Sequence, residues 1–226
     1  GIPGGGKTSY VLHGIANSLN YYYEGKFLFD TDIEIESMKN IDNFSGVHYI
    51  DSNLGKITSR STVGTYIGLL PLIRKIYSAS KESRQKGYQD GHFSWNSSLG
   101  QCPSCEGSGV KIIDLHFLDD LEFVCDECHG KKIKDGPAEV SVEGMSYYEV
   151  VSNELSSVVP KLNLTSKGNR IFDYMKLLGI DYLSLGRSLN TLSGGERQRL
   201  KLFTILQKRL NKSIIFFENI SFGISK

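Results

Sequence analysis

The sequence lacks any run of about 18 consecutive apolar residues, the length that a transmembrane helix needs, so it predicts no membrane span. Nothing at its start resembles a signal peptide, and we expect a cytoplasmic protein with no membrane partner. It also lacks an excess of either charge. With 26 lysines and arginines against 25 acidic residues, the net charge of +1 does not by itself indicate nucleic acid or a lipid surface. Internal repeats, low-complexity tracts and heptads are absent as well, which excludes solenoids and coiled coils.

The first residues, Gly1-Ile2-Pro3-Gly4-Gly5-Gly6-Lys7-Thr8, fit the phosphate-loop pattern G-x-x-x-x-G-K-[ST]. In that pattern backbone N–H groups surround the phosphates of a nucleotide, the lysine reaches the outer phosphates, and the hydroxyl binds Mg²⁺. We therefore expect Lys7 at the phosphates and Thr8 at Mg²⁺. The expected nucleotide contacts in this segment are Gly1, Gly4, Gly5, Gly6, Lys7, Thr8 and Ser9. Because no strand precedes the loop, we expect the chain to be a fragment.

Residues 192–199 read LSGGERQR, which resembles the signature motif of ATP-binding-cassette (ABC) ATPases. Its Ser193-Gly194-Gly195 turn, followed by Glu196, opens a predicted helix. Free amides, a hydroxyl and the positive end of the helix dipole can there meet the γ-phosphate of a nucleotide held by a second phosphate loop. The alternative is a glycine-rich turn that only caps an ordinary helix. The order of the two motifs, with an apolar strand just after the second, favours the ABC interpretation.

Hydrophobic periodicity predicts helices over residues 9–19, 56–90, 145–159, 171–178 and 197–212, and strands over 47–50 and 214–217. These elements predict an α/β fold. Residues 100–136 form a separate cysteine-bearing module.

All four cysteines lie in two C-x₂-C pairs, Cys102 with Cys105 and Cys125 with Cys128, and 19 residues separate the pairs. This spacing fits a zinc site in which four thiolates surround the metal tetrahedrally. Two disulfides or four unrelated thiols are the alternatives, and nothing indicates the secreted environment that disulfides need. Four cysteines leave no open coordination position, so we expect a structural Zn²⁺ ion rather than a catalytic one.

Taken together, these motifs resemble UvrA, the damage-recognition subunit of the bacterial excision nuclease, in its second nucleotide-binding half. Further segments carry the resemblance: residues 50–68, Lys86-Gly87-Tyr88 with His92-Phe93-Ser94-Trp95-Asn96, His116-Phe117-Leu118-Asp119-Asp120, and residues 179–186 (GIDYLSLG). The resemblance implies a P-loop core, an ATP-binding core that we expect residues 1–55 and 190–226 to form. It further implies an inserted, mainly helical signature domain, residues 56–189, that carries the zinc module. It also implies a dimer, or a pair of nucleotide-binding halves, that surveys double-stranded DNA and passes lesions to UvrB under the control of ATP.

Three positions depart from the UvrA pattern. Ser52 stands where the family has the Q-loop glutamine. In an ungapped alignment Glu218 replaces the Mg²⁺-orienting aspartate and Asn219 replaces the glutamate that polarises the attacking water. A slip of one residue would put Glu218 at the glutamate position and Phe217 at the aspartate. Lys7, Glu218 and Asn219 are the candidate catalytic residues, and we expect nucleotide binding to be better preserved than hydrolysis.

Charge is distributed unevenly along the chain. Residues 56–90 carry seven basic and two acidic side chains, as a surface that follows DNA phosphates would. We expect Arg60, Arg74, Lys75 and Arg84 to lie on one exposed surface and to contact DNA, although a solvated basic helix is the alternative. The cysteine module is acidic, and we expect it to act as a staple or hinge rather than to bind phosphates.

Three functions compete. The first is an ATP-binding and DNA-binding component of excision repair, and the second is a UvrA paralogue that acts as an ATP-gated binding or regulatory module, in drug self-resistance or genome defence, with weak hydrolysis. The lost glutamate at Asn219 and the acidic cysteine module favour the second, and the near-complete set of motifs favours the first. A purely structural zinc protein would leave both nucleotide motifs unexplained.

Overall fold

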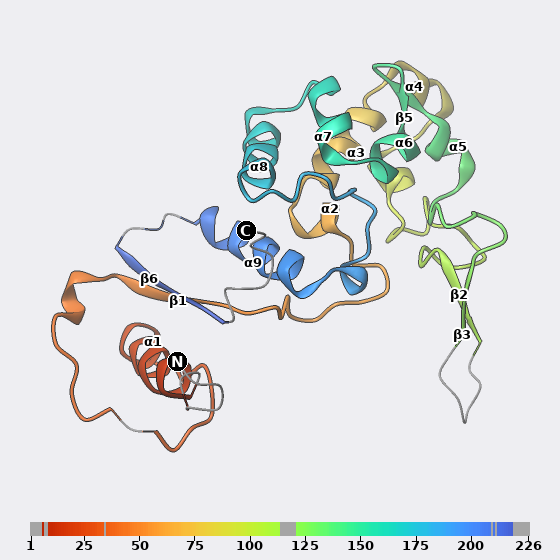
Figure 1. The fold of residues 1–226 in the computed structure, drawn as a ribbon. Helices are drawn as coiled ribbons and strands as arrows, with labels where there is room; N and C mark the ends of the chain where they lie inside the picture. Colours follow the sequence, from red (N-terminus) through yellow and green to blue (C-terminus); the bar gives the residue numbers. More distant parts are fainter. Residues whose placement is uncertain are drawn as a thin grey trace. The chain divides into compact units, whose positions relative to one another are not determined.

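The computed structural model describes residues 6, 9–33, 35–113, 121–208, 210 and 212–218. The secondary structure is mixed α/β, and the chain divides into two compact units. The first unit combines Gly1–Gly55 with Ser193–Lys226, and the second is Lys56–Leu192. The first unit is thus built from both ends of the chain, the red-to-orange and dark blue segments of Figure 1. Within the described residues, no helix is both long enough and apolar enough to span a membrane.

Two parallel strands from distant parts of the sequence lie at the centre of the first unit. Gly46 of β1 (Gly46–Ile50) pairs with Ser213 of β6 (Ser213–Phe217), and Ile50 pairs with Phe217. Because the strands are parallel, their carboxyl ends meet at one edge of the pair. The strands predicted over residues 47–50 and 214–217 are confirmed.

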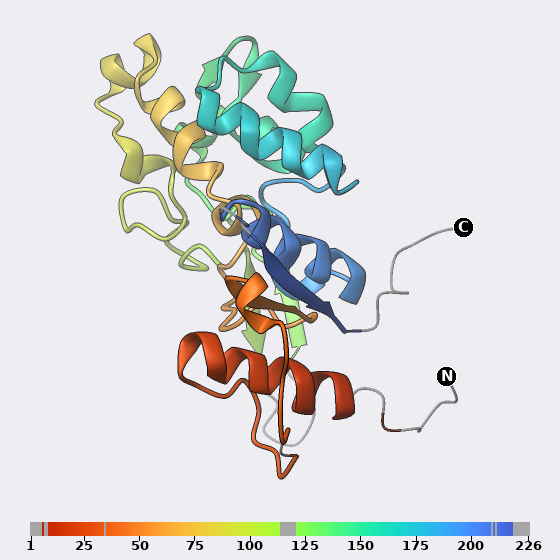
Figure 2. The same cartoon turned by 90° about the vertical axis from the view of Figure 1, so that its left-hand side faces the viewer.

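Helices cover both sides of this strand pair. The π-helix η1 (Ser9–Ala16) continues into α1 (Asn17–Glu24), while α9 (Gly194–Leu206) comes from the C-terminal segment. Both α1 and α9 contact β1, and Figures 1 and 2 show them on opposite sides of the strands. A short 3₁₀ turn, η2 (Ile41–Asn43), precedes β1. The buried apolar side chains of this unit are Leu12, Ala16, Leu19, Val47, Ile50, Leu200, Phe203 and Ile205.

Both long helices of the first unit end at positions that differ from the predicted ones. The helix predicted over residues 9–19 continues to Glu24, where Gly25 adopts φ 70° and its N–H bonds the carbonyl of Tyr21. The helix predicted to reach residue 212 ends at Leu206, and the side chain buried in its last turn is Ile205.

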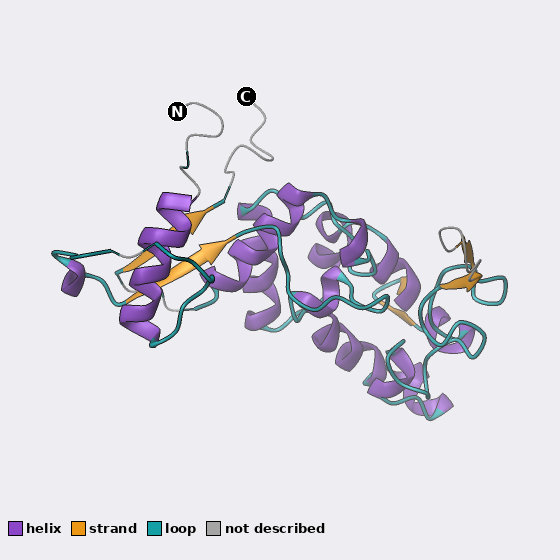
Figure 3. Ribbon diagram, turned by 90° about the horizontal axis from the view of Figure 1, so that it is seen from below, coloured by secondary structure: helices purple, strands orange, loops and turns teal. Residues whose placement is uncertain are grey.

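The second unit is mainly helical, with only short two-stranded pairs among its described residues (Figure 3). Its helical elements are α2 (Val63–Tyr66), α3 (Leu70–Ser78), α4 (Lys81–Lys86), η3 (Asp90–Phe93), α5 (Asp135–Glu139), α6 (Tyr147–Ser152), α7 (Leu155–Val158), η4 (Val159–Lys161), α8 (Ser166–Leu177) and η5 (Leu189–Thr191). Its antiparallel strands are β2 (Val110–Ile113) with β3 (Leu121–Val124), and β4 (Ser141–Val142) with β5 (Met145–Ser146).

Buried aromatic side chains form the core of the second unit. Tyr77, Phe93 and Tyr147 pack with ring centroids 5.1–6.1 Å apart. The hydroxyl of Tyr77 donates to the carbonyl of Met145 at 2.9 Å, and that of Tyr147 donates to the carbonyl of Phe93 at 2.6 Å. Each such ring contributes about 1.5–3 kcal/mol by burial, and the hydroxyls of the two tyrosines are satisfied. Trp95 is also buried, and its Nε1 donates to the carbonyl of Arg60.

The single helix predicted within residues 56–90 is wrong, because three short helices occupy this region. Gly68, with φ 74°, separates α2 from α3. Ser80 starts α4 anew, since its side chain accepts a hydrogen bond from the N–H of Ser83. Likewise, the helix predicted over residues 145–159 is divided into α6 and α7 by the extended backbone of Asn153.

Candidate nucleotide and metal sites

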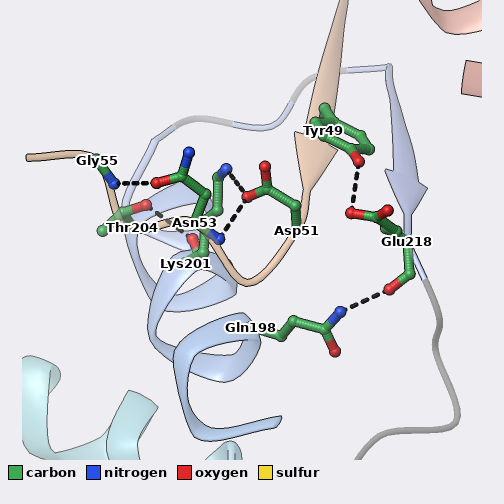
Figure 4. A network of polar contacts seen from close by, with 8 residues as sticks. All are labelled: Tyr49, Asp51, Asn53, Gly55, Gln198, Lys201, Thr204 and Glu218. Carbon is green, nitrogen blue, oxygen red and sulfur yellow. Dashed lines mark hydrogen bonds and ion pairs between the residues drawn. The ribbon is translucent and has the colours of Figure 1, made fainter. Parts of the chain in front are cut away.

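The carboxyl ends of β1 and β6 bring several polar side chains together (Figure 4). Glu218 directly follows β6, and its N–H donates to the carbonyl of Ile50 in β1 at 2.9 Å. Its carboxylate accepts a hydrogen bond of 2.8 Å from the hydroxyl of Tyr49. Burial first, and then the hydrogen bond to Glu218, raise the pKa of Tyr49, so the phenol keeps its proton and donates it. This edge is where open α/β sheets bind ligands.

Helix α9 contributes two further side chains to this edge. Gln198 donates through Nε2 to the backbone carbonyl of Glu218 at 2.5 Å. One turn later, Lys201 forms an ion pair with Asp51, and its ammonium group lies 5.7 Å from the ring centroid of Tyr49. The helix that begins in the LSGGERQR sequence therefore contacts the ends of both strands.

The signature turn starts α9 with a reciprocal pair of hydrogen bonds. Ser193 donates its N–H to Oε2 of Glu196 at 2.7 Å, and its side-chain oxygen accepts from the N–H of Glu196 at 3.3 Å. Ser193 and Gly194 are exposed. A Cβ atom added to Gly194 would meet no atom of the described residues within 4 Å, so packing against these residues does not require glycine there. The turn is thus accessible to an approaching ligand.

Few of the predicted phosphate-loop residues can be placed. Gly1, Gly4, Gly5, Lys7, Thr8 and Asn219 lie outside the described residues. Gly6 has φ 68°, and its carbonyl accepts a hydrogen bond from the N–H of Tyr10 at 2.9 Å. Ser9 opens η1 and is exposed.

The four cysteines form one buried cluster in the second unit, with all of their sulfur atoms within 4.8 Å of one another. The sulfurs of Cys102 and Cys125 are 3.9 Å apart, and those of Cys105 and Cys128 are 3.7 Å apart. A tetrahedral Zn²⁺ ion with Zn–S bonds of about 2.3 Å separates its sulfurs by about 3.8 Å, whereas a disulfide requires about 2.05 Å. The geometry fits a metal ion and excludes disulfides between these pairs.

The backbone around the cluster directs amides toward the sulfurs. Gly109 donates its N–H to the sulfur of Cys105 at 3.3 Å, with φ 83°. Gly107 is required by space, because a Cβ there would lie 2.0 Å from the carbonyl oxygen of Trp95. His129 is exposed and is not part of the cluster.

The thiols differ in their tendency to ionise. The N–H groups of Cys128 and Glu127 lower the pKa of Cys125 to about 6, whereas burial raises the pKa of Cys102 and raises that of Cys128 to about 12. Without a cation the four would not all ionise at neutral pH, but a bound metal ion deprotonates its thiol ligands outright. The donor set therefore fits a thiophilic cation such as Zn²⁺.

Comparison with known proteins agrees with these motifs. The chain is 33% identical over 217 residues to UvrABC system protein A of Malacoplasma penetrans, covering 96% of this chain and 22% of that protein. It is 36% identical over 175 residues to UvrABC system protein A of Pseudomonas aeruginosa, covering 74% of this chain and 18% of that protein. The crystal structure of UvrA2 from Deinococcus radiodurans superposes with a TM-score of 0.82 at 26% identity, over 99% of this chain and 28% of that one. The chain is homologous to part of UvrA. No family model matches it, and it spans about a fifth of the length of the UvrA relatives.

Two of the three positions that depart from the UvrA pattern lie just beyond the carboxyl ends of β1 and β6. Ser52, predicted to lie at the Q-loop position, is exposed beyond β1, and Glu218 is held beyond β6. A carboxylate at the end of β6 fits a Mg²⁺ ion, because one of its oxygens, Oε1, accepts no hydrogen bond from any residue that the structure describes. Sequence reasoning missed Tyr49, Gln198 and Lys201. The spacing of Gln198 and Lys201 on one helical face could have indicated a shared contact.

The four cations predicted to contact DNA are not equally exposed. Lys75 and Arg84 are exposed, but Arg60 and Arg74 are half-buried. Arg60 lies 3.5 Å from the carboxylate of Glu106. Arg74 follows the buried Ile73 on α3, and its Nε is buried without a hydrogen-bond partner among the described residues. Arg60 and Arg74 are therefore less exposed than expected, and the contact of the four cations with DNA stays a prediction.

Proposed function

We propose that this chain is a nucleotide-binding part of a UvrA-like DNA-repair ATPase. In this proposal the first unit is a P-loop ABC core, and Lys56–Leu192 is the signature domain inserted into it. Mg·ATP would bind through Gly4, Gly5, Gly6, Lys7 and Thr8. The observation that carries the proposal is the similarity to UvrA along 96% of the chain, which includes the signature turn at the exposed start of α9.

The same architecture assigns two roles to the signature turn and the cysteine cluster. Ser193, Gly194 and Gly195 would face a nucleotide held by a second nucleotide-binding half or by a second copy of the chain. Cys102, Cys105, Cys125 and Cys128 would hold a structural Zn²⁺ ion, because four thiolates fill its tetrahedral shell and leave no position for a substrate.

The partners follow from the family. Double-stranded DNA would be the macromolecular ligand, with Lys75 and Arg84 at its phosphates, and a UvrB-like protein would receive the lesion. Relatives named UvrABC system protein A support this assignment. The chain represents only part of them, so their DNA and protein partners are carried over as part of the proposal.

A second candidate function is an ATP-gated binding module that hydrolyses ATP very slowly. Ser52, Glu218 and Asn219 favour it, because in-line attack on the γ-phosphate needs a carboxylate that orients water and a complete Mg²⁺ shell. Loss of a general base typically lowers the rate by about 10²–10⁴-fold. Binding, which depends on the phosphate loop, can remain.

Single-turnover hydrolysis and ATP binding by the full-length protein test both functions. We expect ATP binding that Lys7→Ala abolishes, with slow turnover that Asn219→Glu raises. Rapid hydrolysis by the unmodified protein, lost in Glu218→Gln, would place Glu218 at the water and exclude the slow-module alternative. Absence of Lys7-dependent ATP binding would contradict the nucleotide-binding proposal itself.

A further inference from the structure

Tyr49 and Glu218 are 169 residues apart in sequence, yet the phenol of one donates to Oε2 of the other at 2.8 Å. The register of β1 and β6 produces this contact, since Tyr49 pairs with Phe216 and Ile50 with Phe217. Phe29 packs edge-on against the Tyr49 ring, with the centroids 5.2 Å apart. The ammonium group of Lys201 lies 5.7 Å from the same ring. The position of the phenol is therefore determined by its neighbours as well as by its bond to Glu218.

Glu218 is held at three points (Figure 4). Its N–H bonds Ile50, its carbonyl accepts from Gln198, and its carboxylate accepts from Tyr49. The first two bonds set the backbone, but they leave the side-chain torsions free. Only the phenol, among the described residues, sets the direction of the carboxylate.

A glutamate needs this restraint more than an aspartate would. In the ungapped alignment Glu218 stands where the UvrA pattern has an aspartate, and its side chain has one more rotatable bond. Ordering it in a metal site therefore loses more rotamer entropy. Hydrogen bonds from neighbouring groups commonly orient carboxylates that bind metal ions, and they raise metal affinity by doing so.

We propose that Tyr49 is a positioning residue for the Mg²⁺ site, and that its hydroxyl fixes the Glu218 carboxylate in the orientation that binds the ion. This inference rests on the proposed nucleotide-binding function. It assigns the metal contact to Glu218 and its orientation to a side chain of the neighbouring strand. Tyr49 would thus act on the metal through Glu218, which its hydroxyl bonds.

Tyr49→Phe in the full-length protein tests the inference, with a fluorescent ATP analogue as the probe. We expect the Mg²⁺ concentration for half-maximal stimulation of nucleotide binding to rise about 10–100-fold. Nucleotide affinity measured without Mg²⁺ should not change, because the phosphate loop is intact. Electron paramagnetic resonance should show a similar loss of affinity for Mn²⁺ in the ATP complex.

Tyr22→Phe is the matched control, since the hydroxyl of Tyr22 also donates to a carboxylate, that of Asp42, at 2.9 Å. It should leave the Mg²⁺ dependence unchanged, and equal thermal midpoints for the two variants would exclude unfolding as the cause. In a Glu218→Gln background, Tyr49→Phe should have little additional effect, because the two residues act through one contact.

These measurements distinguish a failure of the role inferred for Tyr49 from a failure of the proposed nucleotide-binding function. An unmodified protein that binds Mg·nucleotide, combined with an unchanged or lower Mg²⁺ requirement in Tyr49→Phe, would overturn the inference alone. An unmodified protein that binds no nucleotide would overturn the proposed function and the inference together.

Discussion

Ser193 holds the start of α9 with the same side-chain oxygen and N–H that the proposed nucleotide contact would use. Glu218 similarly joins the two strands through its backbone while its carboxylate is available for a metal ion. At such residues a substitution changes local stability and ligand binding together. Experiments on this chain must therefore separate the two effects residue by residue.

Ser193 permits such a separation, because asparagine also caps helices whereas alanine does not. Ser193→Ala should lower the free energy of unfolding by about 0.5–2 kcal/mol, while Ser193→Asn should change it little. Both should weaken ATP-dependent association if the hydroxyl contacts the γ-phosphate. Chemical denaturation and sedimentation with ATP measure the two effects. Normal association of Ser193→Asn would show that the serine only caps the helix.

For single residues, the sequence predicts a site well only where the residues that form it are close together in the chain. The four cysteines could be assigned because each C-x₂-C pair places two ligands on one turn, and the cluster has the expected geometry. The contact between Tyr49 and Glu218 could not be predicted, because it depends on the pairing register of strands from opposite ends of the chain. Arg74 was misjudged for a related reason, since tertiary packing decides which side of α3 is buried.

Among the elements, the β2–β3 hairpin has little core of its own. Ile112, Ile113 and Phe123 are each at least 50% exposed, and a two-stranded hairpin alone is marginal in water. The cysteine cluster lies at its base, where Cys125 donates its N–H to the carbonyl of Gly109 and Cys102 donates to that of Lys132. A metal ion at the cluster would therefore supply much of the stability of this module.

Removal of zinc should accordingly unfold this module and spare the rest of the second unit. In Cys125→Ser we expect loss of the metal and rapid hydrogen exchange in the described parts of residues 102–134, with protection retained in α8. Lys111→Ala is a control, because it breaks only the exposed ion pair with Asp126, which is worth at most about 1 kcal/mol. If the module were equally protected from hydrogen exchange in metal-free and metal-bound protein, the metal ion would not be what stabilises it.

The helices of the second unit show what the pattern of apolar residues can and cannot predict. Ile73 and Tyr77, which are four residues apart and so lie on one face of α3, are buried. Their helix was predicted too long, because the side-chain cap of Ser80 and the left-handed backbone of Gly68 interrupt it. Periodicity identifies which residues face the core, but local caps and turns determine where each helix ends.

For the whole molecule, net charge is nearly balanced, so DNA affinity would depend on where cations are exposed rather than on their number. The exposed candidates are Lys75 and Arg84, whereas Arg60 is near Glu106 and Arg74 is half-buried. The acidic cysteine module would not add to phosphate binding. The proposed DNA-contacting surface is therefore narrower than the basic composition of residues 56–90 indicates.

Salt dependence measures the size of that surface. Each phosphate contact that is removed should lower the slope of log K against log salt concentration by about one. Neutralising Lys75 and Arg84 together to alanine should therefore lower the slope by about two, and it should weaken binding to intact and damaged duplexes alike, since phosphate contacts carry no sequence or lesion information. Lys161→Ala with Lys167→Ala is the control, because it removes the same charge from exposed side chains in another part of the second unit. If the control pair lowered the slope equally, the effect would be one of net charge and not of specific phosphate contacts. If the loss of affinity were confined to damaged DNA, Lys75 and Arg84 would instead take part in lesion recognition.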